Sequence, residues 1–216
     1  MSDQTYDWKK HHQKYYKAAD WIDKPALFAQ DAISYLPKTG KILDLGAGQG
    51  QDSRYFAEHG YDVVSTDLEE SALDLSKAKL PGKLKEKVTV QKLDLAKPFP
   101  FDDHSFDVVY AHLSLHYFSD AATKAIFAEI NRVLRPGGVL AFFTNSVDDP
   151  EYGTGPEIEP DYFMIGGLAK RYFSVKTAGE YAKNFEVKLL DNNGETYKDA
   201  AKGIHHLIRF IGTKPQ

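Results

Sequence analysis

Glycines and an aspartate are combined in one short segment that could bind a ligand through its backbone. The segment reads Leu43-Asp-Leu-Gly-Ala-Gly-Gln-Gly50 and stands between a run typical of a buried strand and a run typical of a helix. Gly46, Gly48 and Gly50 permit a tight turn and leave open the space that side chains would fill. In an open α/β sheet the ligand crevice lies beyond the carboxyl ends of the strands, so we expect the loop to line that crevice.

Two classes of nucleotide ligand compete for this loop. A dinucleotide fingerprint has Gly-x-Gly-x-x-Gly/Ala, but from Gly46 the third position falls on Gln51. Asp44 would repel a pyrophosphate, whereas it suits a ligand with a cationic end. S-adenosylmethionine (SAM) has such an end, in its α-ammonium and its sulfonium. The loop therefore favours SAM over NAD(P), and a NAD(P)-dependent oxidoreductase stays as the alternative.

Two more carboxylates follow later strands. Asp67 closes the run Val63-Val-Ser-Thr-Asp67, and it could accept hydrogen bonds from both hydroxyls of a ribose. Asp94, in Lys92-Leu-Asp-Leu95, could accept a hydrogen bond from an adenine amino group, with a leucine against the ring. Each also has a purely structural interpretation. Asp44 could bind loop amides, Asp67 could cap the next helix, and Asp94 could only start a turn.

Short β-branched runs alternate with longer helical patterns, which predicts a mainly parallel sheet covered on both faces. Ser119 can cap the longest helix, and Arg135-Pro-Gly-Gly138 ends it. The last two strands have no clear helix between them, so Asp191-Asn-Asn-Gly194 predicts the turn of an antiparallel hairpin. The predicted strands are 41–45, 61–66, 87–93, 106–111, 139–144, 185–190 and 204–211; the predicted helices are 52–59, 69–79, 119–134 and 174–183.

Two segments differ from this alternation. Residues 1–39 are rich in aromatic side chains at helical spacing, and we expect a helical cap on the domain formed by residues 40–216. Tyr15, Tyr16 and Trp21 could then contact the cofactor or the substrate. Residues 145–166 are acidic with no clear period, and we interpret them as an extended, solvated loop. A more specific interpretation is that the negative charges of this loop attract a cationic substrate.

Five motifs in order resemble the class I SAM-dependent methyltransferases. They are Ile-Leu-Asp-Leu-Gly-Ala-Gly-Gln-Gly, Ser-Thr-Asp-Leu, Leu-Asp-Leu, the run from Ser105 to Phe118, and Val-Leu-Arg-Pro-Gly-Gly-Val-Leu. They cover roughly residues 40–145. The overall layout is also weakly similar to small-molecule methyltransferases of the tellurite-resistance and thiopurine type.

The resemblance implies a fold, a cofactor and a set of binding residues. The fold would be α/β, a three-layer α-β-α Rossmann-like sheet of seven mostly parallel strands with a C-terminal antiparallel hairpin strand. The function would be methyl transfer from SAM to a small molecule. The residues expected to bind SAM are Asp44, Gly46, Ala47, Gly48, Gln49, Asp67, Leu68, Asp94, Leu95 and His112.

No catalytic residue is required by the chemistry, because displacement at a sulfonium methyl can proceed by alignment and exclusion of water. A poorly nucleophilic acceptor would need a base, and the candidates are His116, Tyr15 and Tyr16. His112 and His116 have no evident third ligand, so we expect no metal site. The pairs His11-His12 and His205-His206 are more typical of a surface or a sheet edge.

Composition limits the partners. The 216 residues have a formal net charge of −4 and contain no cysteine. There is no general basic field for nucleic acid, no cysteine chemistry, and no apolar run long enough to cross a membrane. We therefore expect a cytoplasmic protein whose partner is a small-molecule methyl acceptor, with the oligomeric state open. A non-catalytic SAM-binding protein and an RNA or protein methyltransferase stay as alternatives.

Overall fold

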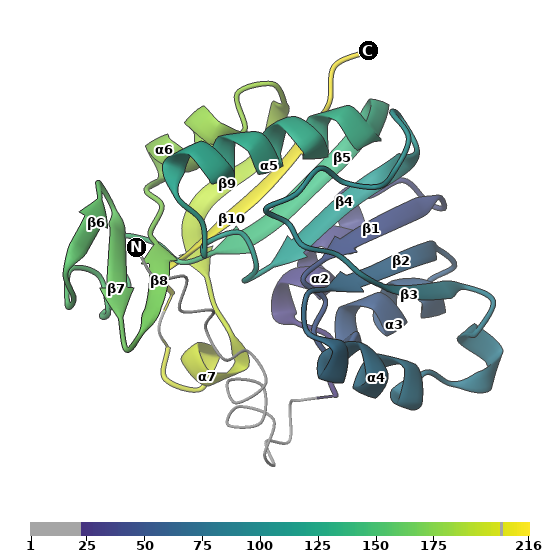
Figure 1. Ribbon diagram of the computed structural model, residues 1–216. Coiled ribbons are helices and arrows are strands. Elements are labelled where there is room, and N and C mark those ends of the chain that lie inside the picture. Colours follow the sequence, from purple (N-terminus) through teal and green to yellow (C-terminus); the bar gives the residue numbers. More distant parts are fainter. Residues whose placement is uncertain (1–22, 204) are drawn as a thin grey trace.

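A seven-stranded sheet organises the computed structural model, which describes residues 23–203 and 205–216 (Figure 1). Its strand order is β3-β2-β1-β4-β5-β10-β9. The strands β1 to β5 run parallel, and β10 is antiparallel to both of its neighbours. Their bounds are β1 Lys41–Leu45, β2 Asp62–Asp67, β3 Val88–Lys92, β4 Phe106–His112, β5 Leu134–Thr144, β9 Glu186–Gly194 and β10 Leu207–Thr213.

Helices cover both faces of the sheet, which gives three layers. In Figure 1 α5 and α6 lie over one face, and α2 and α3 lie over the other. The helices are α2 Leu27–Ala32, α3 Gln51–Glu58, α4 Glu70–Lys79, α5 Asp120–Val133, α6 Val175–Tyr181 and α7 Tyr197–Ala200, with 3₁₀ turns η1 at Ile33–Tyr35 and η2 at Gly82–Leu84. This is the α-β-α Rossmann-like arrangement that the sequence predicts.

Successive residues of the central strands enter two separate apolar clusters, because side chains alternate between the faces of a strand. Leu43 and Val109 pack with α5, while Ile42 and Val108 pack on the other face. There Phe28 of α2 and Phe56 of α3 are almost completely buried. Burying one such side chain contributes about 1.5–3 kcal/mol, so the sheet holds the helices, and the loops between them, in place.

The strand order changes direction between β1 and β4. From β1 the chain moves outward to β2 and β3, then crosses to β4 on the other side of β1. In open α/β sheets, ligands bind beyond the carboxyl ends of the strands at such a change of direction. The glycine segment Gly46–Gly50 follows β1, so the topology places it at this position.

Two local predictions were wrong. Residues 145–166 are not only an extended loop, because β6 Glu157–Glu159 and β7 Tyr162–Ile165 form a small antiparallel sheet with β8 Leu168–Arg171. These strands are too short to show a period in the sequence. Their packing is fixed by Arg171, which forms an ion pair with Glu159 at 2.6 Å and lies over the Tyr162 ring.

The segment Asp191–Gly194 is also not a turn. It continues β9, and Arg209 of the neighbouring strand β10 binds both oxygens of the Asp191 carboxylate. The connection to β10 instead contains the single-turn helix α7, so the antiparallel pair is present without a tight hairpin.

Candidate functional site

The glycine loop is held in a backbone shape that other residues would resist. Gly46 and Gly50 both have φ of +72°, in the left-handed region. A Cβ at Gly46 would lie 2.4 Å from the Cβ of Ser114, and one at Gly50 would lie 2.3 Å from the Ser76 hydroxyl. The Ala47 amide donates to the Thr66 carbonyl at 2.7 Å, which ties the loop to the end of β2. The loop is therefore both tightly turned and tightly packed.

Asp44, the last but one residue of β1, is buried beside this loop. Its Oδ2 accepts a hydrogen bond from the Ser53 hydroxyl at 2.5 Å. Burial raises the pKa of Asp44 to about 8, and the nearby carboxylates of Asp52 and Asp67 add to the rise. A cation placed against this carboxyl would favour its ionised form, so the position suits the positive end of a ligand.

Asp67 ends β2 and faces the glycine loop. Its Oδ2 accepts a hydrogen bond from the Gly48 amide, and its Oδ1 accepts one from the Glu69 amide, both at 2.9 Å. A carboxylate has about four lone-pair sites, so both oxygens can accept further bonds from a ligand hydroxyl. Leu68 follows with 43% of its surface exposed, which places an apolar surface beside the carboxylate.

Asp94 is engaged locally. Its Oδ1 accepts from the Ala96 amide, its carbonyl accepts from the Lys97 amide, and the Lys97 ammonium lies 3.3 Å from Oδ2. It therefore starts a turn, as its structural interpretation predicts, and Leu95 behind it is buried. Contact with an adenine stays a prediction for this residue.

His112 and His116 lie at the carboxyl ends of β4 and β5. The His112 ring stacks on Phe143 of β5, with centroids 5.0 Å apart and planes 3° from parallel. Burial lowers the pKa of His112, which keeps its ring neutral. His116 is buried, with its Nδ1 3.3 Å from the hydroxyl of Thr144. Each histidine thus faces one residue of the end of β5.

Gln49 lies within the glycine loop and bonds to residues outside it. The side-chain oxygen of Gln49 accepts a hydrogen bond from Lys79 at 2.6 Å, and its carbonyl accepts one from Arg54 at 2.7 Å. Gln49 therefore links the loop to α3 and α4.

Tyr15, Tyr16 and Trp21 lie outside the described residues. Within residues 23–203 and 205–216 no group of three acidic or histidine side chains is placed to hold a metal ion.

Comparison with known proteins supports one family. A family model described as a methyltransferase domain matches residues 43–142. An uncharacterized methyltransferase of Mycobacterium tuberculosis is 39% identical over 124 residues, which are 56% of this chain and 47% of the relative. The chain spans about half the length of several curated relatives that it matches.

Solved structures agree in fold. A SAM-dependent methyltransferase from Methanosarcina mazei superposes with a TM-score of 0.71 at 23% identity, covering 86% of this chain and 97% of the other. The Burkholderia thailandensis 1,6-didemethyltoxoflavin-N1-methyltransferase, with its substrate and S-adenosylhomocysteine bound, gives 0.68 at 22%, covering 88% and 77%.

The chain is similar to methyltransferase domains over residues 43–142. Its sheet order, its parallel strands and its antiparallel β10 confirm the fold that the motifs imply. The match at residues 43–142 contains the glycine loop, Asp67, Asp94 and His112. The relatives and structural neighbours named above are methyltransferases, and the neighbours' names specify SAM or its product as their ligand.

The fold also places near the candidate site a residue that the sequence analysis did not assign to it. Because β10 is antiparallel, its first residues lie at the same edge as the carboxyl ends of the parallel strands. His206 directly precedes β10 and is 9% exposed, with its Nε2 3.5 Å from Asp149. His205 points elsewhere and pairs with Glu195 at 3.1 Å. A histidine pair before an antiparallel last strand was the only signal for this in the sequence.

A separate pocket of about 1000 Å³ lies between α5, α6 and the small sheet. Its lining includes Asp120, Glu159, Arg171 and Tyr181. None of the residues expected to bind SAM takes part in it. The pocket therefore lies apart from the residues that the sequence analysis expects to bind SAM. In the part of the chain that the structure describes, every helix is too short or too polar to cross a lipid bilayer.

Proposed function

We propose that this protein transfers a methyl group from SAM to a small-molecule acceptor. The observation that carries the proposal is the pair of carboxylates on either side of the glycine loop. Asp44 is buried and poorly ionised, and Asp67 is bonded to the Gly48 amide. The first suits a cationic group, and the second suits a ribose.

The residues of the chain have separate roles in this proposal. Asp44 would accept the α-ammonium end of SAM, because a buried acid gains most from a nearby cation. Asp67 would accept hydrogen bonds from the ribose hydroxyls, and exposed Leu68 would cover the adenine ring. Gly46, Ala47, Gly48 and Gln49 would approach the ligand with their backbone, and Asp94, Leu95 and His112 would complete its surroundings. Bound SAM supplies an electrophilic methyl group on a sulfonium, and the fold supplies alignment and exclusion of water.

A small acceptor is supported by two observations. The net charge of −4 provides no general attraction for nucleic acid. The Burkholderia neighbour is named for methylating 1,6-didemethyltoxoflavin, a small molecule. We extend only the size class of the acceptor from that neighbour to this chain.

The competing oxidoreductase would bind NAD(P) on the same loop. Asp44 opposes it, because its ionised form, which a cationic ligand stabilises, would repel a pyrophosphate. Gln51 also stands where the dinucleotide fingerprint has its third glycine. A non-catalytic SAM-binding protein would share the cofactor site and differ only in turnover.

The test is a calorimetric titration with SAM, S-adenosylhomocysteine and NAD in parallel. We expect the first two to bind and NAD not to bind. Asp67→Ala should weaken SAM binding by about 1–3 kcal/mol, the value of hydrogen bonds to a charged group. Asp62→Ala is the matched control, because Asp62 begins the same strand at its far end and pairs only with Lys87 at an exposed position.

Binding of NAD alone would overturn the proposal. So would an unchanged SAM affinity in a folded Asp67→Ala protein, as far as the ribose role is concerned. Turnover is then sought with a panel of small acceptors by following the formation of S-adenosylhomocysteine. Binding of SAM without turnover of any acceptor would favour the non-catalytic alternative.

A further inference from the structure

Three histidines follow one another along the end of β5. His112 stacks on Phe143, His116 faces Thr144, and the carbonyl of His206 accepts a hydrogen bond from the Ser146 hydroxyl. The sheet order β1-β4-β5-β10 places His206 on the far side of β5 from the glycine loop. If SAM occupies the loop after β1, the end of β5 and the start of β10 are left for the acceptor.

His206 has a buried ring nitrogen without a hydrogen-bond partner among the described residues. This nitrogen is Nδ1, and the side chain is 11% exposed. Its Nε2 lies 3.5 Å from the Asp149 carboxylate, whose other oxygen accepts from the Glu151 amide at 2.8 Å. Buried polar atoms in folded proteins are almost always satisfied, so an unsatisfied one points to a missing ligand.

A second unsatisfied group lies near the same carboxylate. The Tyr172 side chain is 1% exposed, and its hydroxyl has no partner within the described residues. Burial raises the pKa of Tyr172, and the charges of Asp149 and then Glu151 raise it further. The hydroxyl therefore stays protonated and can donate a hydrogen bond. Backbone bonds fix it beside Asp149, because Val147 donates to Phe173 and Phe173 donates to Asn145.

We propose that His206, held by Asp149, is the general base that deprotonates the methyl acceptor, with Tyr172 as a hydrogen-bond donor beside it. This inference rests on the proposed methyltransferase function. The acceptor it implies carries a weakly acidic O–H or N–H group. Such a group is a poor nucleophile until its proton is removed, whereas a thiolate would not need the base.

The proton passes from the acceptor atom to Nδ1 of His206. The lone pair freed on that atom forms the new bond to the methyl carbon, while the bond between methyl and sulfur breaks with its electrons going to sulfur. Asp149 stabilises the resulting imidazolium through Nε2–H, and no further reactant is needed. Asp149 is a positioning residue here, since it acts through the histidine and does not touch the acceptor.

Nuclear magnetic resonance of protein labelled with ¹⁵N-histidine tests the base directly. In the complex with S-adenosylhomocysteine, His206 should be the neutral tautomer with the proton on Nε2. Phenol, as a small hydroxyl probe, should shift the Nδ1 signal, and anisole, in which that hydroxyl is methylated, should not. Asp149→Asn should disturb the tautomer. Asp148→Asn should not, because Asp148 binds the exposed Asn192 amide instead.

The variant His206→Gln should retain its affinity for S-adenosylhomocysteine within about twofold. With hydroxyl acceptors found in a screen it should lose about 100-fold or more in kcat. The neighbouring His205→Gln is the matched control and should change neither value.

A proton on Nδ1 of His206, or an Nδ1 signal that phenol does not move, would overturn the inference while binding of S-adenosylhomocysteine stands. A protein that binds neither SAM nor its product would instead refute the proposed function.

Discussion

Asp44 keeps a proton at a pH where most aspartates have lost theirs. The cause is burial first, and then the carboxylates of Asp52 and Asp67; the Ser53 hydroxyl opposes the rise. Asp52 is itself committed, since it accepts from the Ala26 amide at 2.7 Å and from the Tyr110 hydroxyl at 2.9 Å. The acid therefore lacks a positive partner among the groups that act on it. A cationic ligand group would supply this missing positive partner.

The raised pKa of Asp44 predicts how stability depends on pH. Between pH 4 and 8 the folded protein holds a proton at Asp44 that the unfolded chain has released, so the free energy of unfolding falls as pH rises through this window. Asp44→Asn has no such proton. Relative to wild type, we expect it to gain at least about 1 kcal/mol of stability between pH 5 and pH 8.

Urea unfolding at both pH values measures this gain, and Asp62→Asn is the control with an exposed carboxylate. The same Asp44→Asn protein should bind SAM more weakly, since it lacks the carboxyl that we propose to accept the ammonium. Parallel pH dependence in wild type and Asp44→Asn would contradict the raised pKa.

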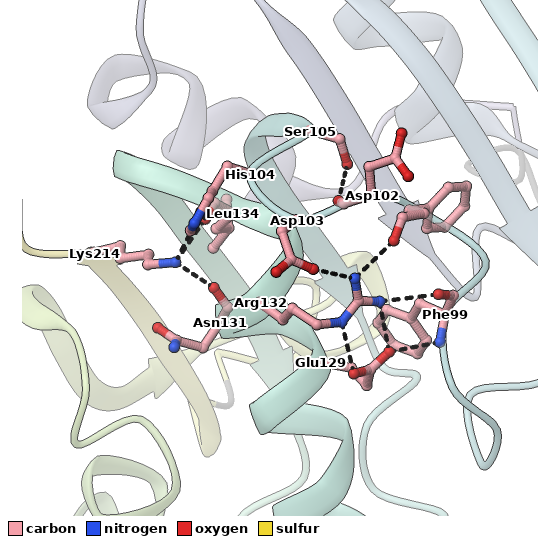
Figure 2. A network of polar contacts seen from close by, with 11 residues as sticks. Phe99, Asp102, Asp103, His104, Ser105, Glu129, Asn131, Arg132, Leu134 and Lys214 are labelled. Atoms are coloured by element: carbon pink, nitrogen blue, oxygen red, sulfur yellow. Dashed lines mark hydrogen bonds and ion pairs between the residues drawn. The ribbon is translucent and has the colours of Figure 1, made fainter.

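Among the helices, α5 is held by polar contacts at its C-terminal end, which lies away from the candidate site. Arg132 in its last turn binds Glu129, Asp103 and the carbonyls of Phe99 and Phe101 (Figure 2). Lys214, after β10, donates to the carbonyls of Asn131 and Leu134 near the helix end, at 2.6 and 2.8 Å (Figure 2). Cations at this end also favour the helix dipole. The network connects α5, the segment before β4 and the end of β10.

Removing Arg132 should loosen this end of the molecule without touching the site. Arg132→Ala leaves the carbonyls of Phe99 and Phe101 without this donor and leaves the Glu129 carboxylate with the Phe99 amide, so we expect a loss of about 1–2 kcal/mol in the free energy of unfolding. Lys124→Ala on the same helix removes only an exposed pair with Asp120 and should cost less than about 0.5 kcal/mol. Denaturant unfolding measures both, and equal losses in the two variants would show that the network does not stabilise α5.

For the whole molecule, the candidate site and the network around Arg132 lie at opposite ends of the strands. The glycine loop and Asp67 lie at the carboxyl ends of the parallel strands, while Arg132 and Lys214 form their contacts at the opposite end. Changes at distant, independent positions usually add in their effect on stability. The stabilisation that a ligand gives at the carboxyl ends of the strands should therefore not depend on a substitution at the opposite end.

Ligand-dependent unfolding measures this independence. S-adenosylhomocysteine at 100 times its Kd should stabilise wild type by about 2.7 kcal/mol, and Arg132→Ala by the same amount. The control ligand is NAD, which should stabilise neither. A smaller gain in Arg132→Ala would mean that α5 transmits strain to the cofactor site.

The sequence by itself determined the sheet and the positions of the glycine loop and the two carboxylates beside it. Glycine at 46, 48 and 50 and carboxylates at 44 and 67 are local patterns, and the parallel strands that hold them are continuous apolar runs with β-branched residues. Neighbouring residues in the chain are neighbours in this half of the fold, so spacing alone was enough to place them. Even the turn at Asp94 followed from its local sequence.

The tertiary structure alone decided the other half. The small sheet of β6, β7 and β8 depends on Arg171 reaching Glu159, and the continuation of β9 through Asp191 depends on Arg209 of another strand. The approach of His206 to Asp149 spans 57 positions of the chain (206 − 149). It exists because an antiparallel strand returns its start to the edge where the parallel strands end. No local spacing records such a contact, because it is fixed by packing and by the direction of strands.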